Sequence, residues 1–85
     1  MDRQEIIDEL KKVLAPYMEN KELLVGINEQ TNLITDLKIN SANLVDIIID
    51  AESKYKIEID LDSAEKMINV GSCIDVIVEK MNLKA

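Results

Sequence analysis

Apolar residues recur at three- and four-residue spacing in the first segment of the chain. They are Ile6, Ile7, Leu10, Val13 and Leu14, with charged residues between them. This periodicity predicts an amphipathic helix. Asp2 and Glu5 have capping-box spacing at its start, although aspartate replaces the usual Ser or Thr. The residue before a proline disfavours the α conformation, so Pro16 should end the helix at about Ala15.

The segment from Tyr17 to Ile39 shows no single period. Two groups rich in apolar residues, 23–27 and 33–39, flank the polar run from Asn28 to Asn32. We interpret this segment as a long ordered loop that includes at most a short helical turn and is held to the core by its apolar side chains. A loop of more than about 15 residues is uncommon in a small domain and is often functional.

A central helix is predicted from Ser41 to Tyr55. One apolar stripe should face the core, and it consists of Leu44, Ile47, Ile48, Ala51 and Tyr55. A second stripe continues from Ser41 and includes Ala42, Val45 and Ile49. A helix in a bundle needs only one buried face, so the second stripe is either additional core or a docking patch. The acidic residues that border it favour docking, and they are Asp46, Asp50 and Glu52.

The remainder of the chain predicts two further helices. Lys56 to Leu61 alternates like a strand but has no partner strand, so we interpret it as an extended linker that buries Ile57 or Ile59. Asp62, with Glu65 three residues later, should cap a short helix from Ser63 to about Ile68. The Val70-Gly71 pair should break that helix. Ser72 and Asp75 then form a capping box for a last helix that ends at about Asn82.

Composition agrees with a single small helical domain over residues 1–85. The chain has 85 residues, no Phe, no Trp and two Tyr, so its core must be aliphatic. With two Gly and one Pro it has few breakers, which favours helices over a turn-rich β fold. We therefore expect an all-α fold, a small helix bundle.

The formal charge of −7 makes nucleic acid a poor partner, because phosphate binding needs a basic surface. From Ser41 to Glu65 there are seven acidic residues against two lysines, a net charge of −5. Such a surface is complementary to basic patches on other proteins. It is also what an ordinary solvated face looks like.

The location of the protein is indicated by what the sequence lacks. Its single cysteine, Cys73, excludes an intramolecular disulfide and agrees with a reducing compartment; it should serve in packing. No apolar run approaches the length of a membrane span, and the N-terminus lacks the apolar core of a signal peptide. We expect a cytoplasmic protein.

The residue types argue against an enzyme. There is no histidine, so Ser-His and Cys-His nucleophilic pairs and histidine-ligated metal sites are impossible. A calcium loop counted from Asp60 would need glycine at its sixth position and glutamate at its twelfth. The chain has Glu65 and Gly71 there, so we expect no metal site. Ser41 is either a helix N-cap or a residue displayed at a helix tip to carry a group.

In these features the chain resembles the acyl carrier proteins, which are small acidic four-helix bundles modified with 4′-phosphopantetheine. The resemblance covers nearly the whole chain. Residues 31–41 are similar to the family's approach to its D-S-L motif, residues 44–48 to its acidic recognition helix, and residues 62–66 to its third helix. Tyr55, Glu58 and Ile59 resemble the exit from the recognition helix.

This resemblance implies the fold, the cofactor and the partners. It implies a four-helix bundle with a long loop between helices one and two and a short third helix. Ser41 would hold the 4′-phosphopantetheine through a phosphodiester, and the arm's thiol would hold acyl groups as thioesters. The partners would be a phosphopantetheinyl transferase and acyl-transferring, ligase or synthase enzymes with basic docking patches, which a monomer would visit. The docking face would comprise Asn40, Ala42, Val45, Asp46, Ile49, Asp50 and Glu52.

The chain departs from the family motif at three positions near Ser41: Asn40 replaces its Asp, Ala42 replaces its Leu, and Lys38 stands where Gly is common. Further along the chain, Asp50 adds a charge where a small residue is frequent, and Asp60 stands where the family has Pro. These departures favour a specialised carrier in a fatty-acid, polyketide or other lipid pathway. Two alternatives stay open: a carrier of aminoacyl, D-alanyl or peptidyl groups, and an unmodified acidic adaptor of the same fold.

Overall fold

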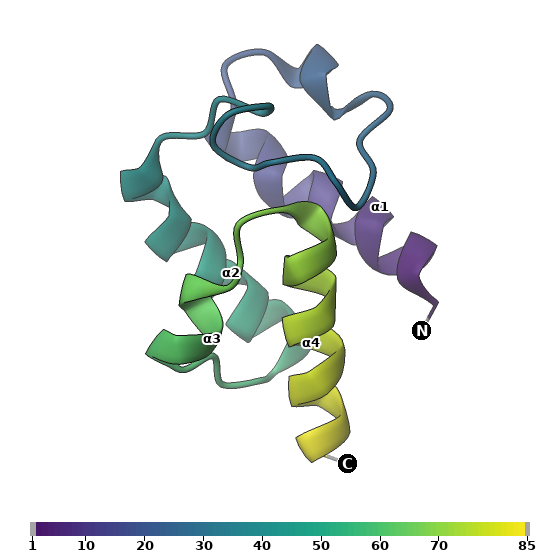
Figure 1. Cartoon of the computed structure of the whole chain (residues 1–85), viewed down its shortest axis with the longest axis vertical. Coiled ribbons are helices and arrows are strands. Elements are labelled where there is room, and N and C mark those ends of the chain that lie inside the picture. Colours follow the sequence, from purple (N-terminus) through teal and green to yellow (C-terminus); the bar gives the residue numbers. More distant parts are fainter. Residues whose placement is uncertain (1, 85) are drawn as a thin grey trace.

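The computed structural model describes residues 2–84, and this part of the chain is helical (Figure 1). Its α-helices are α1 (Arg3–Leu14), α2 (Leu44–Tyr55), α3 (Leu61–Glu65) and α4 (Val70–Lys84). Short 3₁₀ turns occur at Ala15–Tyr17 (η1), Lys21–Leu24 (η2) and Ser41–Asn43 (η3). The expected all-α four-helix bundle, with its long loop and short third helix, is confirmed.

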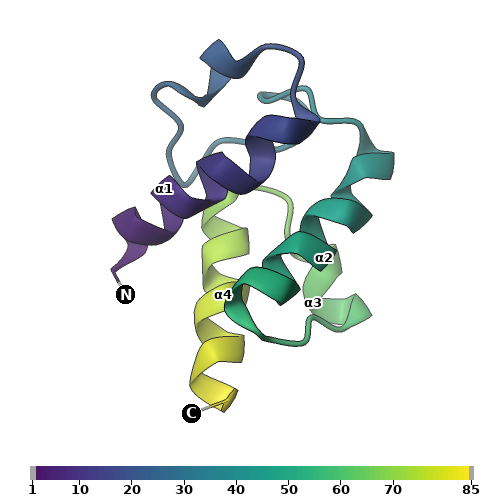
Figure 2. The ribbon, with the colours of Figure 1, turned by 180° about the vertical axis from the view of Figure 1, so that it is seen from behind.

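Three helices form the body of the bundle. α1 contacts both α2 and α4, which also contact each other, and Figure 2 shows α1 passing in front of α4. The loop between α1 and α2 lies over the end of the bundle at which α2 and α4 begin (Figures 1 and 2). Ser41 belongs to this end, because η3 leads directly into α2.

The first helix forms as its apolar spacing predicts. The Asp2 side chain accepts a hydrogen bond from the Glu5 backbone N–H at 2.9 Å, which satisfies one of the free donors of the first turn. The core-facing residues Ile6, Ile7, Leu10 and Leu14 are buried. The α-helix ends at Leu14, and Pro16 lies in the 3₁₀ turn that follows, where its missing N–H is not needed.

The core is aliphatic, as the composition requires. Its fully buried large side chains are Ile6, Leu14, Ile39, Val70, Ile74 and Ile77. The predicted inner stripe of α2 joins this core: Ile47 and Ala51 are buried, and the remaining members pack against it half-buried. Ile57 is the linker residue that is buried, at 7% exposure.

The predicted start of the third helix is wrong by two residues. The structure begins α3 at Leu61, and Asp60 rather than Asp62 is its N-cap, since its carboxylate accepts a bond from the Ser63 N–H at 2.8 Å. Both aspartates are followed by residues that suit a helix. The chain enters in an extended conformation at Asp60 (φ −75°, ψ 171°), and this geometry selects it as the cap.

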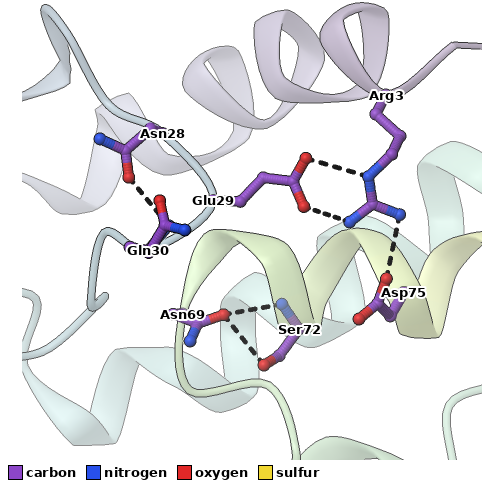
Figure 3. A network of polar contacts seen from close by, with 7 residues as sticks. All are labelled: Arg3, Asn28, Glu29, Gln30, Asn69, Ser72 and Asp75. Carbon is purple, nitrogen blue, oxygen red and sulfur yellow. Dashed lines mark hydrogen bonds and ion pairs between the residues drawn. The ribbon is translucent and has the colours of Figure 1, made fainter.

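The fourth helix also begins earlier than predicted. α4 starts at Val70, and Asn69 rather than Ser72 accepts the capping bonds, from both the N–H and the hydroxyl of Ser72 (Figure 3). Gly71 is therefore a residue of the helix and not its breaker. Gly71 lies close to the loop, because its N–H donates a hydrogen bond to the Glu29 carbonyl at 2.9 Å.

Backbone hydrogen bonds tie the long loop to the segment that begins α4. Besides the bond of Gly71, the Val70 N–H donates to the Thr31 carbonyl at 3.0 Å and the Leu33 N–H to the Ile68 carbonyl at 3.1 Å. Arg3 adds side-chain bonds, to the Glu29 carboxylate and to Asp75 at 3.0 Å (Figure 3). The Arg3 guanidinium holds the pKa of the Glu29 carboxyl below its usual range. These bonds hold the loop to α1 and α4.

We predict that Gly71→Ala destabilises the protein by about 1–3 kcal/mol, because the added methyl group overpacks the contact between loop and helix. A Cβ at Gly71 would lie 3.0 Å from the Glu29 carbonyl oxygen and 3.1 Å from the Glu29 Cβ. Without this contact, replacing glycine by alanine in a helix would stabilise it, by roughly 0.5–1 kcal/mol. Urea unfolding distinguishes the two signs, and a more stable variant would contradict the contact.

Candidate functional site

Ser41 is the first residue of the turn that opens the central helix. It is exposed, and the N-cap before it is Asn40, whose side-chain oxygen accepts a bond from the Ala42 N–H at 2.9 Å. The interpretation of Ser41 as the N-cap is therefore wrong. Asn40 takes that role because it has the extended backbone of a cap, with φ −64° and ψ 132°. The Ser41 hydroxyl is left at the helix tip.

The segment that leads to Ser41, residues 32–39, is held in place by bonds and contacts of its own side chains. The Asn32 side chain accepts bonds from the N–H groups of Ile34 and Thr35, each at 2.9 Å, and the Asp36 carboxylate accepts one from the Asn32 N–H at 2.8 Å. The apolar anchors Leu33, Leu37 and Ile39 are buried. Together these contacts fix the position of the helix tip relative to the core.

Lys38 adopts a left-handed conformation, with φ 57°. This backbone region is costly for residues with a Cβ and easy for glycine. In this chain the turn is made with a lysine, so a cationic side chain stands three residues before Ser41.

The second stripe of the central helix is exposed. Val45 and Ile49 are 60% and 54% exposed, and Ala42 is also exposed, so these residues are not additional core. Exposed Asp46 and Asp50 lie beside them on α2. The structure therefore brings the tip residues Asn40 and Ser41 together with one exposed face that combines apolar and acidic groups. We call Ala42, Val45, Asp46, Ile49 and Asp50 the α2 face.

Glu52 differs from the other predicted acids. It is half-buried, and its carboxylate accepts a bond from the Ile59 N–H at 2.8 Å. This bond spans the linker after α2 and satisfies a backbone donor there. Glu52 thus helps to hold the linker, and less of its carboxylate is free than at Asp46.

Sequence reasoning did not single out Tyr17 at this site. The Tyr17 hydroxyl, from η1, donates a hydrogen bond of 2.6 Å to the Asp50 carboxylate. This bond raises the pKa of Tyr17 to about 12, with smaller effects of partial burial and of the charges of Asp50 and Asp46. The unusual presence of an acid at position 50 was the available signal, but its partner is 33 residues away.

We predict that Asp50→Asn lowers the pKa of Tyr17 from about 12 toward the ordinary value of about 10. Because the folded-state pKa of Tyr17 is raised, its bond to Asp50 stabilises the folded protein. This stabilisation is fully present below about pH 10 and is lost as the pH rises through about 12. Tyrosinate absorbance during alkaline titration measures the shift. Tyr55 provides an internal reference, since its pKa is raised by burial and by its bond to Glu9. An unchanged titration of Tyr17 would contradict the bond.

The remaining reactive groups are not arranged for catalysis. Cys73 is buried, and burial raises the pKa of its thiol to about 12, in agreement with the predicted packing role. Among residues 2–84, no group of His, Cys, Asp and Glu side chains could hold a metal ion. A hydroxyl such as that of Ser41 is a weak nucleophile without an adjacent base.

Two hollows lie away from the helix tip. One, of about 420 Å³, is an open groove lined by Lys56, Ile57, Glu58, Lys80 and Leu83. The other, of about 90 Å³, is lined by Ile6, Val78, Met81 and Asn82. Neither of these hollows is bordered by Ser41.

The chain is similar to curated acyl carrier proteins over most of its length. The protein from Desulforapulum autotrophicum is 37% identical over 84% of this chain and 91% of its own. That from Lactobacillus acidophilus is 35% identical over 91% of this chain and 94% of its own. No protein-family model matches the chain. The chain belongs to the acyl carrier protein family.

A solved structure agrees with this assignment. The acyl carrier protein from Enterococcus faecalis superimposes with a TM-score of 0.74 at 25% identity, over 94% of this chain and 99% of the other. Acyl carrier proteins are carriers rather than enzymes, so the expectation that this chain is not an enzyme is confirmed. Within residues 2–84 none of the helices has the length and apolar character needed to cross a membrane.

Proposed function

We propose that this acyl carrier protein holds acyl groups as thioesters on a 4′-phosphopantetheine arm joined to Ser41. The observation that carries the proposal is the display of Ser41 at the tip of the central helix, exposed and not used as the cap. Asn40 supplies the cap in its place. The serine hydroxyl is therefore available for modification at no cost to the helix.

The surroundings of Ser41 fit a phosphodiester. The first N–H groups of a helix and its dipole favour negative charge at this end, and η3 continues into the 12 residues of α2. Asn40 caps the helix without adding a negative charge. The thiol at the far end of such an arm supplies the thioester chemistry. The chain has no histidine to serve as a base for the Ser41 hydroxyl, and we propose that the transferase supplies one.

The α2 face fits enzymes with basic docking patches. Asp46 and Asp50 would attract such patches, and Val45 and Ile49 would provide apolar contact area. Charge complementarity accelerates encounter, and a small contact area permits rapid release. The partners we propose are a phosphopantetheinyl transferase and acyl-transferring, ligase or synthase enzymes of a fatty-acid, polyketide or specialised lipid pathway.

The proposed carrier function also bears on domain organisation, oligomeric state and location. Residues 1–85 would act as one carrier domain and as a monomer that visits its partners in turn. A cytoplasmic location fits the single free cysteine, which is buried. Asn40 and Ala42 support a second candidate, an unmodified acidic adaptor, because they alter the motif on both sides of Ser41.

Cargo loading tests the proposal and separates the classes of carrier. The protein is first incubated with coenzyme A and a broad-specificity transferase, and then offered either acyl donors with an acyltransferase or amino acids with an adenylating ligase. Acyl groups should attach and be released by hydroxylamine, as thioesters are. Loading by the adenylating ligase alone would indicate an aminoacyl or peptidyl carrier, and no loading in either reaction would favour the adaptor.

A further inference from the structure

The turn after α1 borders the α2 face. The Tyr17 ring packs against the core, while its hydroxyl reaches the Asp50 carboxylate at 2.6 Å. The charge of Asp46, one helical turn before Asp50, also acts on the Tyr17 hydroxyl. η1 therefore borders one edge of the α2 face and places the Tyr17 hydroxyl near the exposed acids Asp46 and Asp50.

We propose that Tyr17 is a positioning residue for partner docking: its hydroxyl holds one oxygen of Asp50 and leaves the other oxygen to a cationic side chain of the partner enzyme. This inference rests on the proposed docking role of the α2 face. It adds a residue outside α2 to that role. It also gives Asp50 a defined orientation before the partner arrives.

The geometry allows Tyr17 to orient the Asp50 carboxylate without competing with the partner for it. A carboxylate has two oxygens and about four lone-pair sites, and the Tyr17 bond occupies only the Oδ2 atom. An exposed Asp side chain that is otherwise free must be ordered when a partner binds, which costs affinity. Because the Tyr17 ring is already packed against the core, its hydroxyl orders Asp50 in advance.

Other acids of the central helix lack this arrangement. The Glu52 carboxylate holds the Ile59 N–H and serves the linker. Asp46 is exposed and affects Tyr17 through its charge. Asp50 is thus the acid of the α2 face that is held by a side chain from another element.

The chain contains a matched control for this bond. Tyr55 also donates to a carboxylate, that of Glu9 at 2.8 Å, which links α2 to α1. Tyr55 belongs to the inner stripe of α2 and packs against the core. Tyr55→Phe removes a tyrosine–carboxylate bond of the same kind without touching the α2 face.

Steady-state modification by a broad-specificity phosphopantetheinyl transferase with coenzyme A tests the inference. Tyr17→Phe should raise the KM for the carrier about 2- to 10-fold, the cost of ordering one side chain, and leave kcat unchanged. In an Asp50→Asn background, where no carboxylate remains to be held, Tyr17→Phe should have no further effect. Tyr55→Phe should leave both KM and kcat at the wild-type values.

The outcomes separate this inference from the proposed function. If Asp50→Asn raises KM but Tyr17→Phe does not, or if Tyr17→Phe raises KM equally in both backgrounds, positioning by Tyr17 is wrong and docking on the α2 face stands. If neither Asp46→Asn nor Asp50→Asn changes KM, the docking face itself is wrong. A wild-type protein that no transferase modifies overturns the proposed function and this inference together.

Discussion

Replacing Ser41 by alanine should abolish acyl carriage completely and change the free energy of unfolding by less than about 0.5 kcal/mol. The substitution removes only the hydroxyl, which is exposed at the helix tip. Asn40 keeps the capping bond to the Ala42 N–H, and alanine is a good helix former. The loss should therefore be chemical and not structural. Acyl labelling after transferase treatment measures the first effect, and urea unfolding the second.

Ser53→Ala is the matched control for this loss. Ser53 is an exposed serine in the last part of α2, the helix that η3 leads into, and its replacement should leave acyl labelling at the wild-type level. Carriage that survives in Ser41→Ala would show that the attachment site lies elsewhere. Equal loss in both variants would show that the assay reports folding.

Ile74→Ala should lower the free energy of unfolding by about 2–5 kcal/mol, because it removes buried methyl groups and leaves a cavity. Ile74 is 0% exposed, in the first half of the helix that contacts both α1 and α2. Small domains have marginal stability, so much of the variant should be unfolded in moderate urea. The midpoint and slope of the urea transition, followed by circular dichroism, measure the change.

Ile49→Ala makes the same chemical change on the surface of α2. Its side chain is 54% exposed, so the expected effect on stability is within about 0.5 kcal/mol. A similar loss for Ile49 and Ile74 would contradict the assignment of Ile49 to an exposed face. The pair of variants thus tests both the core and the α2 face.

Local patterns were enough to predict most of the fold. Apolar spacing identified α1, the inner face of α2 and the last helix, because burial of one helix face follows directly from that spacing. The absence of a single period from Tyr17 to Ile39 predicted the long loop, and the capping signal after the linker predicted the short third helix. The exposure of Val45 and Ile49 was one of two alternatives that spacing left open.

Errors arose where several residues could play one role. Three pairs of residues compete for the cap: Asn40 and Ser41, Asp60 and Asp62, and Asn69 and Ser72. In each pair the first side chain accepts the capping bond, and at Asn40 and Asp60 it has the extended backbone of a cap. Because capping preferences of these residue types are similar, the sequence did not discriminate between them. Each helix tip therefore starts earlier than its predicted cap would place it.

Long-range contacts were beyond pattern reasoning. Gly71 looks like a helix breaker in sequence, yet it is a helical residue that accommodates the Glu29 backbone. Tyr17 and Asp50 are 33 residues apart, and nothing in their local patterns joins them. Such pairs become neighbours only through the packing of the loop and α1 against α2.

The most direct test of the carrier function is the intact mass of the wild-type protein after incubation with coenzyme A and a broad-specificity phosphopantetheinyl transferase, followed by peptide mapping. If Ser41 is the attachment site, the protein should gain one phosphopantetheine on the peptide that contains Ser41. No gain, with that transferase and with those of the source organism, would contradict the carrier function and make the unmodified acidic adaptor the leading function.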